Sequence, residues 1–176
     1  VIVIYPDALD KVWDFGEGQI SNALDRRVND LRYFAALLEQ VRSTHSIDSE
    51  RIFATGMSRG GQASYFLACK MPGRFRAIAP VVMPLPAYLQ DDCAGIPPTG
   101  LLVMNGTADP IVPYEGGWIM LRNQRRDRVM STDQTQAIWR RLNGCTGSAP
   151  SRRIGAVTVT EASGCRAPVV NYRIEG

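Results

Sequence analysis

The chain has 176 residues, of which 45% are hydrophobic and 21% charged, and its net charge is +3. This length and composition are typical of one globular domain with a buried core. The small net charge excludes the strongly basic class of nucleic-acid-binding proteins, and the absence of a long apolar run excludes membrane-spanning proteins. We therefore expect neither a nucleic acid nor a membrane as a partner.

The first 50 residues predict a strand, a loop and a helix. Residues 1–5 are apolar and predict a strand, and the Pro, Gly and Asp content of residues 6–18 predicts a loop. The loop residues Trp13 and Phe15 fit a substrate cleft and a core position equally well. Apolar residues then recur every three or four positions from about 21 to 44 and predict an amphipathic helix.

Residues 51–70 carry the clearest functional pattern. Residues 51–55 predict a short buried strand and residues 62–70 a helix, and the sequence between them, residues 56–60, is Gly-Met-Ser-Arg-Gly. A G-x-S-x-G sequence between a strand and a helix is the nucleophile elbow of α/β-hydrolases. We expect a turn so tight that positions 56 and 60 both require glycine, with Ser58 held in a strained conformation. The alternative is a glycine-rich turn in which Ser58 only caps the helix; the context favours Ser58 as the nucleophile.

An acid follows at the position that a catalytic triad requires. Residues 77–83 and 99–104 predict two buried strands, and Asp109 lies in the turn after the second. In this fold the acid after such a strand accepts a hydrogen bond from the catalytic histidine. The alternative is an Asp-Pro turn former. The single histidine, His45, precedes Ser58, whereas the order in this fold is Ser, acid, His, so we interpret it as a helix C-terminal residue.

The remaining segments complete an alternating pattern. The arginine cluster at 122–128 predicts a solvated loop or helix face, and Ser131 or Thr132 caps a helix through 142. Residues 155–160 and 169–174 predict strands. Strands that alternate with helices indicate an α/β fold with a mostly parallel sheet flanked by helices.

The four cysteines are spaced unlike a metal site, and with one histidine in the chain we expect no metal and no cofactor. Disulfides would indicate an exported protein and buried thiols a cytosolic one. Cys145 and Cys165 lie beside glycines in turns, which favours a bond between them. A second bond between Cys69 and Cys93 is the further candidate.

Several segments together resemble the polyhydroxybutyrate depolymerase and feruloyl-esterase-like family of α/β-hydrolases. The resemblance covers nearly the whole chain and rests on residues 5–7, 47–48, 51–61, 68–69, 78–80, 106–117, 139, 143–145 and 172–176. It implies a serine esterase that acts on polyhydroxyalkanoate-type, feruloyl or short acyl esters, with Ser58 as nucleophile and Asp109 as acid. The backbone N–H of Arg59 would be one oxyanion donor. The family is typically secreted and disulfide-bonded, which implies a secreted or periplasmic protein.

Two features of that family are not found in the 176 residues. The family's catalytic histidine follows the last strand, and a His-Gly loop with the other oxyanion donor precedes the first. We therefore expect residues 1–176 to be a single hydrolase domain that is incomplete at both ends, with its histidine beyond the C-terminus and little activity alone. The rival hypotheses are an inactive hydrolase-fold binding protein and a peptidase of the same fold; no oligomeric state is predicted.

Overall fold

The computed structural model describes residues 1–9, 12–15 and 29–176. These residues form two units, Val1–Ile47 and Asp48–Gly176. The beginning of the predicted helix, residues 21–28, and part of the predicted loop lie outside the described residues.

The first unit contains the helix α1 (Asp30–Thr44). It begins after Asn29, whose side chain accepts a hydrogen bond from the Arg32 N–H at 2.9 Å, as an N-cap residue does. The Trp13 ring packs on the rings of Tyr33 and Phe34, with centroids 6.3 and 5.0 Å apart. This aromatic cluster favours the core interpretation of Trp13 over the cleft interpretation.

Residues 1–5 form no strand, so that prediction was wrong. Apolar, β-branched residues favour extended structure, but a strand exists only where its backbone pairs with a neighbour. Val1–Tyr5 has no such pairing with any residue that the structure describes, and the side chains of Val1, Val3 and Tyr5 are exposed.

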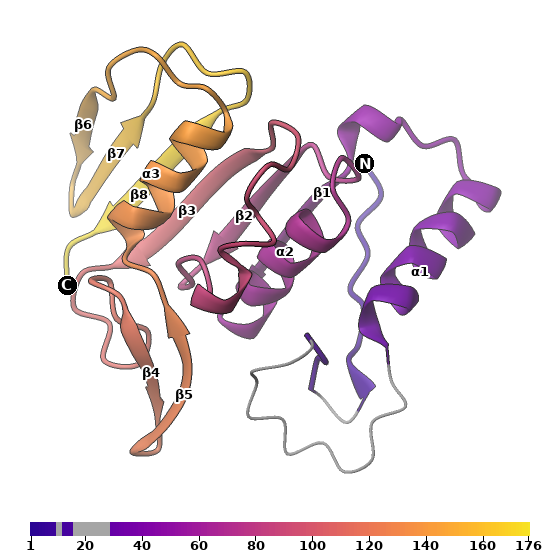
Figure 1. Ribbon diagram of the computed structural model, residues 1–176, viewed down its shortest axis with the longest axis horizontal. Coiled ribbons are helices and arrows are strands. Elements are labelled where there is room, and N and C mark those ends of the chain that lie inside the picture. The colour runs from indigo at the N-terminus through magenta and orange to yellow at the C-terminus, as the bar shows by residue number, and fades with distance from the viewer. Residues whose placement is uncertain (10–11, 16–28) are drawn as a thin grey trace. The chain divides into compact units, whose positions relative to one another are not determined.

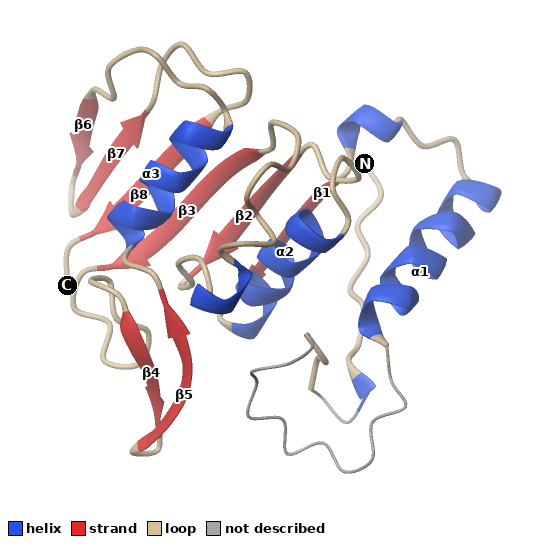
Figure 2. Cartoon of the chain, viewed as in Figure 1, coloured by secondary structure: helices blue, strands red, loops and turns tan. Residues whose placement is uncertain are grey.

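The second unit is built on a six-stranded sheet (Figures 1 and 2), which confirms the predicted α/β class. Its strand order is β1-β2-β3-β8-β7-β6. The strands are β1 (Phe53–Met57), β2 (Ala77–Val81), β3 (Gly100–Gly106), β6 (Ser151–Ile154), β7 (Val157–Glu161) and β8 (Val169–Ile174). The four strands from β1 to β8 in this order are parallel, and β7 and β6 continue the sheet antiparallel.

The burial of β1 corrects one prediction. The elbow strand was expected to be buried, but Phe53 and Met57 are 60% and 69% exposed. Side chains alternate between the two faces of a strand, so Phe53, Thr55 and Met57 share one face, and all three are exposed. A Cβ on Gly56 would point at Gly60 of α2, so these side chains lie on the face that α2 does not cover.

The arginine cluster lies on a β-hairpin, so the predicted loop or helix face was wrong. The strands β4 (Gly117–Leu121) and β5 (Gln124–Val129) pair antiparallel as a separate sheet, seen below the main sheet in Figure 1. Arg122 and Asn123 connect them with φ of 51° and 61°. Two consecutive residues with positive φ are typical of the tight turns that join hairpin strands.

The helices α2 (Arg59–Lys70) and α3 (Thr132–Leu142) lie on one face of the sheet, in front of it in Figure 1. The rings of Tyr65 on α2 and Trp139 on α3 meet at 5.3 Å, and both side chains are 0% exposed. Ser131 caps α3 in a capping box with Gln134, which resolves the choice between Ser131 and Thr132. Short 3-10 turns, Ser49–Arg51 (η2) and Ala87–Leu89 (η3), precede β1 and follow β2.

All four cysteines are in disulfides, as the sequence predicted. Cys69–Cys93 joins α2 to the segment after η3, and Cys145–Cys165 joins the turn after α3 to the segment before β8. Their Cα atoms are 4.6 and 3.9 Å apart. Both cross-links lie within the second unit.

Candidate active site

Ser58 lies at the junction of β1 and α2 in a conformation that is rare for a residue with a side chain. Its φ and ψ are 53° and −113°. Its N–H donates to the Val81 carbonyl at 2.9 Å, and its carbonyl accepts from the Gln62 N–H at 3.0 Å. These bonds hold a backbone that costs about 1–3 kcal/mol of strain. The Ser58 side chain makes no capping hydrogen bond, which disfavours the interpretation of Ser58 as only a helix cap.

The glycine requirement of this turn differs from the expectation at one position. A Cβ on Gly56 would lie 2.6 Å from the carbonyl carbon of Gly60, so Gly56 is required. Among the described residues outside its own helix, a Cβ on Gly60 would meet no atom within 4 Å, so the expectation that position 60 requires glycine was wrong. Gly61 is the second constrained position, because its Cβ would lie 2.8 Å from the Met83 Cβ.

Asp109 lies three residues after the end of β3 and is partly buried. Its Oδ1 accepts from the N–H groups of Ile111 and Val112 at 2.8 and 2.9 Å, so the carboxylate organises its own turn. Within the part of the chain that the structure describes, Oδ2 accepts no hydrogen bond. One oxygen of Asp109 therefore stabilises the turn, and the other is available to a donor such as an imidazole N–H.

The sheet register brings Ser58 and Asp109 to the same edge. Met57 is aligned with Val81, and Val81 with Met104, so β1, β2 and β3 end together. With adjacent strands about 4.8 Å apart, the ends of β1 and β3 are separated by about 10 Å. Ligands of open α/β sheets bind at this carboxyl edge.

The end of the described chain lies at this edge too. The Thr107 N–H donates to the Ile174 carbonyl at 2.8 Å, and the Gly176 N–H donates to Thr107 Oγ1 at 3.3 Å. Gly176 is thus beside the turn that carries Asp109.

His45 is not brought to this site by any described contact. It caps the C-terminus of α1 in the first unit, exposed, with its Nδ1 2.8 Å from Thr44 Oγ1. The helix-end interpretation is confirmed. The second unit contains no histidine in its sequence, so its own residues supply no imidazole base.

Arg59 is the first residue of α2, and its side chain takes part in a polar network that the sequence did not reveal. The Arg59 guanidinium contacts Gln62 Oε1 at 3.1 Å and Asp127 Oδ2 at 3.4 Å. Gln62 follows Ser58 by one helical turn, a spacing that is visible in the sequence. Asp127 comes from β5, and no local pattern indicates that it would reach the elbow.

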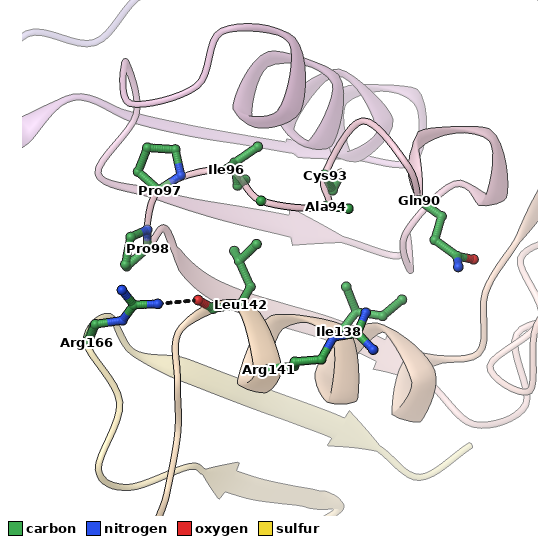
Figure 3. Close-up of a pocket in the computed structure, with 11 residues that line it drawn as sticks. Gln90, Cys93, Ala94, Ile96, Pro97, Pro98, Ile138, Arg141, Leu142 and Arg166 are labelled. Carbon is green, nitrogen blue, oxygen red and sulfur yellow. Dashed lines mark hydrogen bonds between the residues drawn. The ribbon is translucent and has the colours of Figure 1, made fainter.

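A separate groove lies at the end of the sheet where the parallel strands begin, opposite the end that carries Ser58 (Figure 3). Its volume is about 500 Å³, and its lining includes Pro97 and Pro98 before β3, Leu142 at the end of α3, and Arg166 before β8. Arg166 donates to the Leu142 carbonyl at 2.9 Å. Since these residues lie at the amino ends of β3 and β8, this groove is not part of the Ser58 site.

The described residues contain neither a metal-ligand cluster nor a membrane-spanning helix. In residues 1–9, 12–15 and 29–176, no three His, Cys, Asp or Glu side chains cluster as metal ligands would. No helix in those ranges has the length and apolar character needed to span a bilayer.

Comparisons with known proteins identify feruloyl esterases among the sequence relatives of this chain. The chain is 30% identical over 179 residues to feruloyl esterase C of Emericella nidulans, covering 99% of this chain and 56% of the relative. It is 33% identical over 117 residues to probable feruloyl esterase C of Aspergillus niger, covering 66% of this chain and 38% of the relative. The chain therefore spans about half or less of the length of these relatives.

A solved structure described as a thermostable esterase aligns with 82% of this chain and 28% of its own, at a TM-score of 0.49 and 17% identity. No family model matches. By sequence, the chain is similar to feruloyl esterase C over nearly its whole length.

Proposed function

We propose that the protein to which this chain belongs is a serine esterase, a carboxylic ester hydrolase with Ser58 as its nucleophile. The observation that carries this proposal is the strained backbone of Ser58, at φ 53° and ψ −113°, where β1 meets α2. A strand-to-helix turn of this kind presents a serine hydroxyl above the end of a sheet. Relatives named feruloyl esterases support the same reaction class.

In the proposed mechanism Ser58 Oγ attacks the ester carbonyl while a histidine removes its proton. The Arg59 N–H, at the N-terminus of α2, donates to the oxyanion of the tetrahedral intermediate. The histidine then protonates the departing alcohol, and water releases the acid from the acyl-enzyme with the same base. Asp109 Oδ2 accepts a hydrogen bond from the Nδ1–H of that imidazole and stabilises the imidazolium that forms.

We place the histidine after Gly176. The Gly176 N–H contacts Thr107, two residues before Asp109, so a segment continuing from there begins beside the acid. Both units would then belong to one hydrolase domain that extends beyond residues 1–176.

The substrate that we favour is a feruloyl ester, ahead of polyhydroxyalkanoate-type and simple short acyl esters. This choice follows the names of the relatives. The two disulfides support an exported protein, because such bonds persist in oxidising compartments.

The test compares residues 1–176 with a longer form that continues through the native sequence after Gly176. Methyl ferulate and p-nitrophenyl acetate are the substrates, and Ser58→Ala and Asp109→Asn are made in the longer form. We expect activity in the longer form only, abolished by Ser58→Ala and lowered about 10⁴-fold by Asp109→Asn. Enzyme-like turnover by residues 1–176 alone would refute the placement of the histidine, and full activity of Ser58→Ala would refute the nucleophile.

A further inference from the structure

A buried carboxylate from the hairpin contacts the first turn of the nucleophile helix. Asp127 on β5 is 8% exposed, and Gln62 on α2 is 1% exposed. Asp127 Oδ2 accepts from Gln62 Nε2 at 3.0 Å and lies 3.4 Å from Arg59 Nη1. Burying a carboxylate is costly unless it is paired, and these partners from α2 provide that pairing.

The three side chains form a closed ring. Arg59 Nη1 donates to Gln62 Oε1 at 3.1 Å, Gln62 Nε2 donates to Asp127, and Arg59 reaches Asp127 directly. Gln62 Nε2 also lies 3.3 Å from the Tyr88 hydroxyl on η3. A reversed amide would put Gln62 Oε1 against the carboxylate, so Asp127 fixes the orientation of this amide.

The hairpin end that carries Asp127 is itself anchored. Val129, two residues further along β5, forms a bridge with Pro86, and the Met130 N–H donates to the Leu85 carbonyl at 2.9 Å. Leu85 is fully buried. The end of β5 is therefore bonded to the segment after β2, while the Asp127 carboxylate on the same strand contacts α2.

Both α2 partners of Asp127 adjoin the reacting groups. Arg59 directly follows Ser58, and the Gln62 N–H closes the turn on the Ser58 carbonyl at 3.0 Å. The Arg59 side chain is 42% exposed, so the network, more than burial, restrains it. A displacement of about 1 Å in a group that stabilises a transition state can cost about 100-fold in rate.

We propose that Asp127 is a positioning residue for the oxyanion hole: through Gln62 and the Arg59 side chain it holds the first turn of α2, keeping the Arg59 N–H aimed at the substrate oxyanion. This inference rests on the proposed function, in which Ser58 is the nucleophile. It adds the hairpin β4–β5 to the elements on which catalysis depends.

The test uses the ester-hydrolysing longer form of the protein, with Asp127→Leu and Asp127→Asn. The matched control is Asp92→Asn, which removes the carboxylate paired with Lys70 at the other end of α2, at 2.6 Å. Three quantities are measured: kcat and KM for methyl ferulate per titrated Ser58, the Kd of phenylboronic acid, and Tm. Phenylboronic acid is chosen because its tetrahedral adduct with serine places an oxygen in the oxyanion position.

We expect Asp127→Leu to lower kcat about 10- to 100-fold and to raise the Kd of phenylboronic acid by a similar factor. The KM should stay within about threefold of the unsubstituted value. Asp127→Asn keeps an acceptor oxygen for Gln62 and Arg59, so its kcat and its affinity for phenylboronic acid should fall less than those of Asp127→Leu. Adding Arg59→Met to Asp127→Leu should cause little further loss, since both residues act in one network. Asp92→Asn should change neither kcat nor the boronic acid Kd.

Unchanged kcat and boronic acid affinity in Asp127→Leu, with only Tm lowered, would overturn the inference and leave Asp127 a purely structural residue. Activity that persists in Ser58→Ala would instead overturn the proposed function itself. The two failures are thus distinguished in one set of variants.

Discussion

At the scale of single residues, Tyr65 combines deep burial with an unpaired hydroxyl. Its side chain is 0% exposed in the contact between α2 and α3, and its hydroxyl has no hydrogen-bond partner in the described structure. Burial raises the pKa of the Tyr65 phenol well above its usual value of 10.0. In the unfolded chain the phenol ionises near pH 10, whereas in the folded chain it stays protonated, so stability falls as the pH rises above 10.

We therefore predict that Tyr65→Phe raises the free energy of unfolding at pH 7 by about 1 kcal/mol, because it removes an unsatisfied buried hydroxyl. The loss of stability between pH 9 and about 10.5 should also become smaller. Urea denaturation at these pH values measures both effects. Tyr114→Phe is the matched control, because the Tyr114 hydroxyl contacts Asp133 at 3.5 Å and its removal should bring no gain. A destabilised Tyr65→Phe would contradict the account.

The sequence predicts the residues of the candidate site only where the chemistry is local. Ser58 is found from its neighbours in sequence, and Asp109 from the strand that precedes it. No local pattern in the sequence marks Asp127, because its partners, Gln62 and Arg59, are 65 and 68 positions away along the chain. Only the folding of the hairpin back onto α2 brings these groups together.

At the scale of elements, the turn between β1 and α2 makes unequal demands on its glycines. We predict that Gly56→Ala destabilises the turn by several kcal/mol and abolishes esterase activity, since its Cβ would lie 2.6 Å from backbone of Gly60. Gly60→Ala should fold normally and gain up to about 1 kcal/mol of stability, because alanine has the higher helix propensity and its Cβ meets no atom of residues 1–9, 12–15 and 29–176 outside the helix. Thermal unfolding and methyl ferulate hydrolysis measure both variants. Equal damage from the two substitutions would show that the G-x-S-x-G pattern, not local sterics, sets the requirement.

The elements that the sequence predicted correctly have strong periodicity or clear caps, such as α3 with Ser131 and the apolar strands β2, β3 and β8. The errors occur where pairing decides the structure. Ser151–Ile154 is an exposed edge strand with no apolar alternation and was not predicted; it forms by pairing with β7 across Gly155. Residues 1–5 have the opposite property, a strand-like composition without a pairing partner among the described residues.

At the scale of the whole molecule, the two disulfides close segments of similar length in different surroundings. The separations are 24 residues for Cys69–Cys93 and 20 residues for Cys145–Cys165. A disulfide that closes a loop of this length raises the free energy of unfolding by about 3 kcal/mol. Cys69 and Cys93 are buried, whereas Cys145 and Cys165 are partly exposed.

We predict that dithiothreitol reduces Cys145–Cys165 first, because thiolate attack requires access to the sulfur atoms. Alkylation of the released thiols followed by peptide mass spectrometry gives the order. The variant Cys145→Ser/Cys165→Ser should lose about 3 kcal/mol of unfolding free energy in urea and should keep the Cys69–Cys93 bond. Simultaneous reduction of both bonds, or first reduction of Cys69–Cys93, would contradict the role of burial.

The position of Gly176 has a practical consequence for anyone who expresses this chain. Its N–H contacts Thr107, in the turn that carries Asp109, so whatever is fused after Gly176 begins beside the candidate acid. A polyhistidine purification tag fused there would place imidazoles beside Asp109, where the proposed mechanism requires a histidine base. Residual hydrolysis by such a fusion would be difficult to distinguish from the native reaction. An affinity tag without histidine, or one that is cleaved before the assay, avoids this artefact.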